Sequence, residues 1–105
     1  MKEVTVQELK TMKDQKEDFQ LIDIREEYEF DICDLGGELI PMGDIVDHLD
    51  KINKTKKVVL HCRTGKRSAS VLQMLEQQHG FTNLYNLKGG IMAWAEEIDP
   101  EMAKY

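Results

Sequence analysis

The chain has 105 residues, and 14 lysines and arginines against 20 aspartates and glutamates give a net charge of −6. This length allows one domain with a single modest core, which we expect to span residues 1–105. The acidic balance speaks against a nucleic-acid partner, and no apolar run is long enough to cross a membrane. The first residues contain no apolar signal region, so we expect a cytoplasmic protein, and a monomer at this size.

The cysteine and histidine pattern excludes two further classes. Cys33 and Cys62 are the only cysteines, and they are too few for a disulfide scaffold. The three histidines are scattered, and no Cys/His spacing typical of a zinc site occurs. We therefore expect free thiols, no metal and no organic cofactor.

The first half of the chain predicts short strands that alternate with short helices. Thr5 and Glu8 match a capping box at the start of the first helix, and Asp44 is the expected N-cap of the helix over 44–52. In chain order the elements are an edge strand at Val4, a helix over 6–13, a buried strand over 20–24, an acidic helix over 26–33, a small strand over 39–40 and a helix over 44–52.

The second half continues the alternation. Its apolar run over 57–61 is the expected central strand, and it is followed by a helix over 67–79 that Gly80 ends, a strand over 83–87, and a final helix that opens at Gly89 and ends before Pro100. Strands that alternate with helices predict an α/β fold with a parallel sheet covered on both faces.

Cys62 directly follows the central strand and opens a six-residue loop that leads into a helix. Ligands of open α/β sheets bind beyond the carboxyl ends of the strands. The loop contributes backbone N–H groups and a helix N-terminus, and Arg63, Lys66 and Arg67 add three positive charges without an acid. Such surroundings lower the pKa of a thiol, so we interpret Cys62 as a nucleophile that meets an anionic substrate.

Three segments of the chain, over 21–30, 61–69 and 87–94, together resemble the motifs of single-domain rhodanese-like sulfurtransferases. They occur in the family's order, and the resemblance extends from about residue 4 to 99. The pattern is most similar to the rhodanese modules of adenylyltransferases that serve ubiquitin-like sulfur carriers. The resemblance implies a central, mostly parallel sheet of about five short strands with helices on both faces.

The resemblance also implies a mechanism. A sulfane sulfur from thiosulfate or a similar small anion, or from a protein donor, would pass through a persulfide on Cys62 to a thiol or cyanide acceptor. Asp23 and Arg25 would form a supporting ion pair, with Ser68 as a further supporting residue. The residues expected to bind the donor are Arg63, Thr64, Gly65, Lys66 and Arg67.

Several alternatives stay open. A protein-to-protein persulfide relay, or a module that only binds partners, would show little turnover of small molecules. The Cys-x4-Arg loop is one residue shorter than that of phosphatase and arsenate reductase relatives, which favours sulfur transfer over phosphate hydrolysis. Cys33 is expected in the core, although a disulfide with Cys62 would suit a redox sensor. His61 is expected to point away from Cys62, because side chains alternate along a strand.

Overall fold

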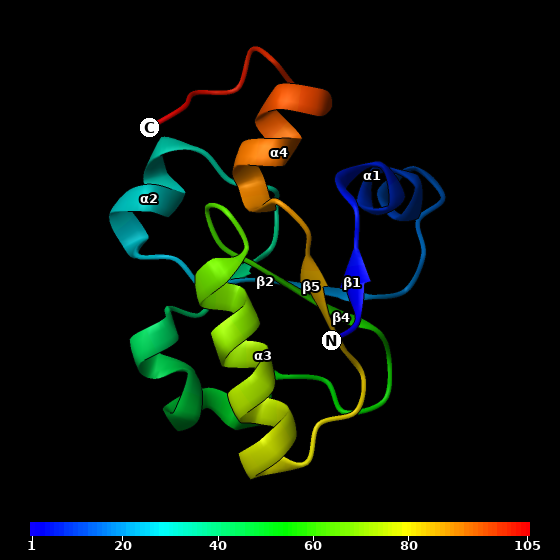
Figure 1. The fold of residues 1–105 in the computed structure, drawn as a ribbon, viewed down its shortest axis with the longest axis vertical. Helices are drawn as coiled ribbons and strands as arrows, with labels where there is room; N and C mark the ends of the chain where they lie inside the picture. The colour runs from blue at the N-terminus through cyan, green and yellow to red at the C-terminus, as the bar shows by residue number, and fades with distance from the viewer.

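The computed structural model describes all 105 residues and consists of five parallel strands between two layers of helices (Figure 1). The strand order is β1-β5-β4-β2-β3, and every neighbouring pair is parallel, which confirms the predicted architecture. The elements are β1 (Glu3–Val4), α1 (Val6–Asp14), β2 (Gln20–Asp23), α2 (Glu27–Ile32), β3 (Glu38–Leu39), η1 (Met42–Lys51), β4 (Val58–His61), α3 (Lys66–His79), β5 (Leu84–Leu87) and α4 (Gly90–Glu97).

The ends of the helices follow from local sequence signals. Thr5 and Glu8 form the predicted capping box of α1: the Thr5 hydroxyl accepts from the Glu8 N–H, and the Glu8 carboxylate accepts from the Thr5 N–H. At the carboxyl end of α3, the longest α-helix of the chain, Gly80 adopts a left-handed conformation with φ +70° and ends the helix as predicted.

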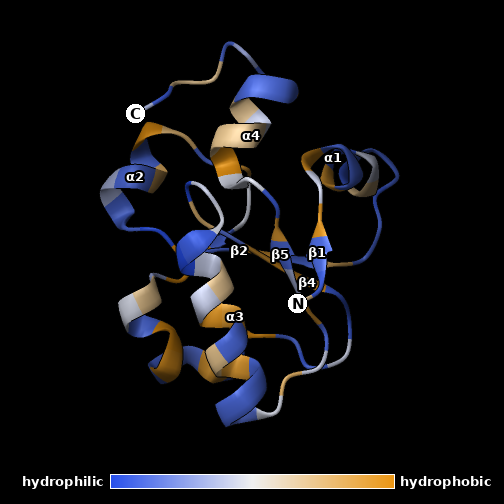
Figure 2. Cartoon of the chain, viewed as in Figure 1, coloured by the Kyte–Doolittle hydropathy of each residue, from blue (hydrophilic) through white to orange (hydrophobic).

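The two faces of the sheet carry separate apolar cores. One core lies under α3 and η1 and contains Ile45, Leu60 and Leu72, whereas the other lies under α1 and α4 and contains Leu9 and Ile91. Figure 2 shows that the beginning of α4, which contributes to the second core, is apolar and that the far end of this helix is hydrophilic. No helix is long and apolar enough to cross a membrane.

The segment predicted as a helix over 44–52 differs from the expectation. It is a 3-10 helix that begins two residues earlier, at Met42, and it contains a kink at His48. Asp44 is therefore not the N-cap: its backbone N–H instead donates to the carbonyl oxygen of Pro41 at 2.8 Å, an i to i+3 contact in the first turn. Ile45, Leu49 and Ile52 have the i, i+4, i+7 spacing of an α-helix, and the kink at His48 interrupts this periodicity between Ile45 and Leu49.

The register of the strands brings one set of strand ends to a common edge. Asp23 in β2 is paired with His61 in β4 and with Leu39 in β3. The residues that follow these strands, among them Cys62, consequently leave the sheet at the same edge, where α2, α3 and α4 also begin. Any site at this edge can draw on side chains from all of these elements.

Candidate active site

Cys62 lies at the carboxyl end of β4 and is almost completely buried, with 1% of its surface exposed. The start of α4 fixes the loop behind it, because the N–H groups of Ile91 and Met92 donate to the carbonyl oxygens of Cys62 and Arg63 at 3.0 Å each. This close approach requires Gly90. Its φ is +61°, and a Cβ atom there would lie 2.7 Å from the Cys62 carbonyl oxygen.

Three hydrogen-bond donors surround the Cys62 sulfur. The N–H of Gly65 lies 3.1 Å from Sγ, and both the N–H and the hydroxyl of Ser68 lie 3.4 Å from it. Burial raises the pKa of the Cys62 thiol, but hydrogen bonds from Ser68, Gly65 and Thr64 outweigh burial, and the pKa ends below its ordinary value. The direction agrees with the prediction, but the hydrogen-bond donors of the loop and helix, rather than the loop cations, produce the lowering.

Asn86 in β5 supports these donors and was missed by the sequence analysis. Its Oδ1 accepts from the Ser68 hydroxyl at 2.5 Å, and its Nδ2 donates to the carbonyl oxygen of Gly65 at 3.1 Å. Asn86 is 3% exposed, and a polar residue in the buried strand over 83–87 was the one signal that could have revealed it. The Ser68 hydroxyl can give its single proton either to Asn86 or to a Cys62 thiolate.

Arg67, at the start of α3, is held by Glu29 of α2. Its Nη1 and Nη2 donate to the two carboxylate oxygens at 2.8 Å each, a bidentate ion pair. This hydrogen bond holds the pKa of Glu29 at about 2, although burial opposes the shift. The sequence analysis placed Glu29 in an acidic helix without assigning it a partner, and the structure buries it. The pair neutralises one of the three positive charges that the sequence predicts for the loop.

The other loop residues have different surroundings. The Arg63 guanidinium lies 5.0 Å from the centre of the Tyr105 ring, and its Nη2 donates to the main-chain oxygen of Tyr105. Thr64 and Lys66 are exposed, and Lys66 forms no ion pair. Gly65 precedes α3 with φ +102° and is buried against β5 and the start of α4.

Asp23 and Arg25 form a buried ion pair behind the loop, as the resemblance implies. Arg25 Nη2 lies 2.7 Å from Asp23 Oδ2, and the Arg25 Nε also donates to the same carboxylate. Arg25 further donates to the carbonyl oxygen of Cys33 at 2.6 Å and to the Tyr105 hydroxyl at 2.9 Å. These contacts connect β2 with α2 and with the segment that follows α4, so the pair organises the wall of the site.

Neither His61 nor Cys33 forms a hydrogen bond with the Cys62 sulfur. The His61 imidazole is fully buried, and its Nε2 lies 3.7 Å from Asp23 Oδ2. Burial lowers the pKa of His61 to about 4, so the ring is neutral at neutral pH. Cys33 is a half-buried free thiol that ends α2 and packs against the core under α1 and α4.

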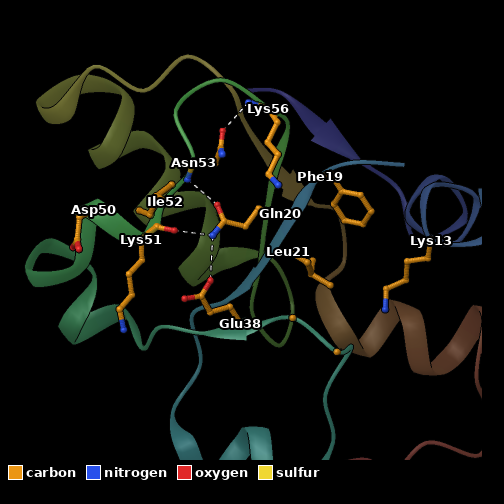
Figure 3. Close-up of a pocket in the computed structure, with 12 residues that line it drawn as sticks. Lys13, Phe19, Gln20, Leu21, Glu38, Asp50, Lys51, Ile52, Asn53 and Lys56 are labelled. Carbon is orange, nitrogen blue, oxygen red and sulfur yellow. Dashed lines mark hydrogen bonds between the residues drawn. The ribbon is translucent and has the colours of Figure 1, made fainter. Parts of the chain in front are cut away.

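The largest hollow on the surface is not at Cys62. It has a volume of about 490 Å³ and lies near the amino end of β2, beside Gln20 (Figure 3). There the Gln20 side chain joins Glu38, the Lys51 carbonyl oxygen and the Asn53 N–H, so its contacts hold loops together. No three His, Cys, Asp or Glu side chains come together in a way that could hold a metal ion.

Comparisons with known proteins agree with this geometry. The sequence model of the family described as Rhodanese-like domain matches residues 5–97 of this chain. MoeZ of Mycobacterium tuberculosis, named as an adenylyltransferase/sulfurtransferase, is 37% identical over 105 residues; the match covers 97% of this chain but 26% of MoeZ, so the chain spans about a quarter of that relative. YtwF of Bacillus subtilis, named as a sulfurtransferase, is 36% identical over 107 residues, with 96% of this chain and 97% of YtwF covered.

A solved structure gives the same fold. The crystal structure of a rhodanese-like domain protein from Staphylococcus aureus superposes with a TM-score of 0.83 at 33% sequence identity, and the match covers 93% of this chain and 95% of that one. The fold that the sequence resemblance implied is thereby confirmed.

Proposed function

This chain belongs to the rhodanese-like family, and from that premise we propose that it is a sulfurtransferase that carries the transferred sulfur on Cys62. One observation carries the proposal: the Cys62 sulfur accepts from the backbone N–H groups of Gly65 and Ser68 at the junction of β4 and α3, with the Ser68 hydroxyl also within 3.4 Å. Donors at this junction favour a thiolate, which is the nucleophilic form of cysteine. The names of its relatives support the same chemistry.

The proposed reaction has two steps. The Cys62 thiolate attacks the outer sulfur of thiosulfate, a new S–S bond forms, and the S–S bond of the donor breaks with release of sulfite. The persulfide keeps one negative charge and sulfite carries two, so the three charges of the reactants are conserved. Cyanide or a thiolate then takes the outer sulfur, and Cys62 returns as a thiolate.

The loop supplies binding groups for these steps. The N–H groups of Gly65 and Ser68 would stabilise the persulfide anion, much as an oxyanion hole stabilises a negatively charged oxygen. Lys66, exposed and without an ion pair, would attract the dianionic donor. Arg63 would add a second charge, and Thr64 a hydroxyl. Arg67, paired with Glu29, is assigned to shaping the loop wall.

A protein partner is part of the proposal. MoeZ carries the matching region within a longer protein whose name includes an adenylyltransferase, and the proteins named MOCS3 of Zea mays do the same, with 23% of their length matched. We therefore propose that the physiological donor or acceptor is a protein that presents a persulfide or a thiol to Cys62.

Thiocyanate formation from thiosulfate and cyanide tests the enzymatic proposal. We expect turnover in the unmodified protein, none after Cys62→Ser, and unchanged turnover after the matched substitution Cys33→Ser. Thiocyanate formation that survives Cys62→Ser would refute the assignment of the nucleophile. A protein that accepts sulfur from thiosulfate but passes it to thiols of a reduced protein rather than to cyanide would be a relay.

A further inference from the structure

Asn86 lies at the end of a chain of buried polar groups that begins at the Cys62 sulfur. The Ser68 hydroxyl oxygen lies 3.4 Å from Sγ and 2.5 Å from Asn86 Oδ1. Ser68 is fully buried and Asn86 is 3% exposed, so bulk water does not reach these contacts. On its other side, Asn86 Nδ2 donates to the carbonyl oxygen of Gly65, whose own N–H donates to Sγ. The amide therefore contacts two of the residues that surround the reacting sulfur.

The two distances from the Ser68 hydroxyl indicate which acceptor it serves in this structure. A carbonyl oxygen only accepts, so the 2.5 Å contact with Asn86 Oδ1 requires the Ser68 hydroxyl as its donor. The hydroxyl has a single proton, and its 3.4 Å contact with Sγ is the longer of the two. The Ser68 oxygen can still accept from Cys62 while the sulfur is a thiol. A thiolate has no proton to donate, and it attracts the same hydroxyl proton that Asn86 holds.

We propose that Asn86 is a positioning residue that holds the Ser68 hydroxyl proton away from Cys62 while the sulfur is a thiol, and that the hydroxyl turns to the sulfur when the thiolate forms. The hydroxyl keeps its proton throughout, because only the acceptor of its hydrogen bond changes, and the thiol proton leaves to water. Asn86 acts through Ser68 and touches no reacting atom itself. The inference deepens the proposed function and rests on it in one respect, since the proposed reaction begins and ends with a Cys62 thiolate.

Competition for the Ser68 proton has two opposite effects on the reactivity of Cys62. The thiolate is less stable while Asn86 competes for the proton, so fewer Cys62 side chains are ionised at low pH. The thiolate that does form is more basic and therefore more nucleophilic, with a Brønsted coefficient of about 0.45. Removal of the Asn86 amide should consequently speed the reaction of Cys62 at low pH and slow it at high pH. A change in packing or access would instead multiply the rate by one factor at every pH.

The formation of a mixed disulfide between Cys62 and hydroxyethyl disulfide, a small neutral reagent, tests the proposal without sulfur transfer. Its rate is followed across pH by peptide mass spectrometry in the unmodified protein, Asn86→Leu, Ser68→Ala and the double variant. Leucine is close to asparagine in size and accepts no hydrogen bond. The carbonyl oxygen of Gly65 keeps its other hydrogen bond, from the Ala69 N–H at 3.1 Å.

Asn83→Leu is the matched control for the loss of a partly buried amide. Asn83 directly precedes β5, and its Nδ2 donates to the carbonyl oxygens of Asn53 and Lys56 rather than to the Cys62 loop. The substitution is the same as in Asn86→Leu, and it leaves the contacts of Ser68 in place. A general effect of losing an amide near β5 would therefore appear in both variants.

The ionisable groups around the loop are identical in the four proteins, so their effects cancel in the comparison. Burial lowers the pKa of His61 to about 4, and the imidazole is neutral over the pH range in which Cys62 ionises. The groups are Arg63, Lys66 and Arg67 of the loop and α3, Glu29 and Cys33 of α2, the buried Asp23, Arg25 and His61, and Tyr105.

We expect Asn86→Leu to raise the thiolate population at low pH about fivefold, since the Ser68 hydroxyl no longer breaks a bond to serve the sulfur. The less basic thiolate should be about twofold less reactive, so the rate should rise about two- to threefold at low pH and fall about twofold at high pH. The two profiles should not cross when Asn86→Leu is introduced into Ser68→Ala, or in Asn83→Leu. Asn86→Val, which suits a strand, carries the test if the leucine variant does not fold.

A rate that changes by the same factor at every pH in folded Asn86→Leu would overturn the proposal, and so would a slower reaction at low pH. Profiles that cross equally in the Ser68→Ala background would also overturn it, because no hydroxyl remains there to change its acceptor. The proposed sulfurtransferase activity can fail separately: a protein that forms no persulfide with thiosulfate still yields these rate profiles.

Discussion

Ser68→Ala is the sharpest perturbation of the Cys62 thiolate that the structure offers. The substitution removes one of three donors to the sulfur, the hydroxyl at 3.4 Å, and leaves the two backbone N–H groups in place. A hydrogen bond to a charged acceptor contributes about 2 kcal/mol. The hydroxyl must give up its bond to Asn86 Oδ1 to serve the thiolate, which costs about 1 kcal/mol.

The net loss is therefore about 1 kcal/mol, equivalent to about a fivefold smaller thiolate population at a pH below the thiol pKa. The assay is the pH dependence of iodoacetamide alkylation at Cys62, with Cys33 followed separately by peptide mass. The matched control is Ser70→Ala, an exposed serine of the same helix whose hydroxyl contacts only the Lys66 carbonyl oxygen. An alkylation profile that does not move toward higher pH in Ser68→Ala would refute the role given to the hydroxyl.

Two further substitutions test the surroundings of the loop. Glu29→Gln should lower the free energy of unfolding at pH 7 by about 2 kcal/mol, measured by urea unfolding. Because the folded-state pKa of Glu29 is lowered to about 2, the unmodified protein should lose this extra stability as the pH falls from 4.5 toward 2. The control Glu27→Gln, at an exposed position of the same helix, should change the stability little. Gly90→Ala should lower the free energy of unfolding by about 3 kcal/mol and slow alkylation of Cys62, since a Cβ atom would collide with the loop backbone. The control Gly43→Ala, with open space around it, should change the free energy of unfolding by no more than about 0.5 kcal/mol. Equal stabilities for the two variants would contradict the requirement for glycine at position 90.

The sequence was sufficient to predict the parts of the fold that depend on local signals. Alternating apolar strands and short helices, the Thr5 capping box and Gly80 each indicated the element that the structure contains. The position of Cys62 at a strand end followed from the same pattern, because parallel strands bring their carboxyl ends to one edge. The 3-10 helix after Pro41 was not predicted, since Ile45 and Leu49 have the i, i+4 spacing of an α-helix and nothing in the sequence indicated the kink at His48.

The surroundings of the nucleophile depended on contacts between distant residues. Glu29 and Arg67 are 38 positions apart, and Tyr105 is 76 positions from Glu29, so composition alone could not show that a loop cation is neutralised or that a tyrosine joins the site. Asn86 likewise acts on the loop from β5. The sequence predicted both the backbone N–H groups of the loop and its three positive charges. The structure shows the N–H donors at the sulfur, but the pairing of Arg67 with Glu29 leaves a smaller free charge around it.

The central claim, that Cys62 carries sulfur, is tested most directly by the mass of the protein after incubation with thiosulfate and removal of excess reagent. We predict a gain of one sulfur atom, located on the peptide that contains Cys62, and its loss on addition of cyanide. The gain should be absent in Cys62→Ser and present in Cys33→Ser. A protein that keeps its original mass, or that gains sulfur on Cys33 alone, would contradict the account.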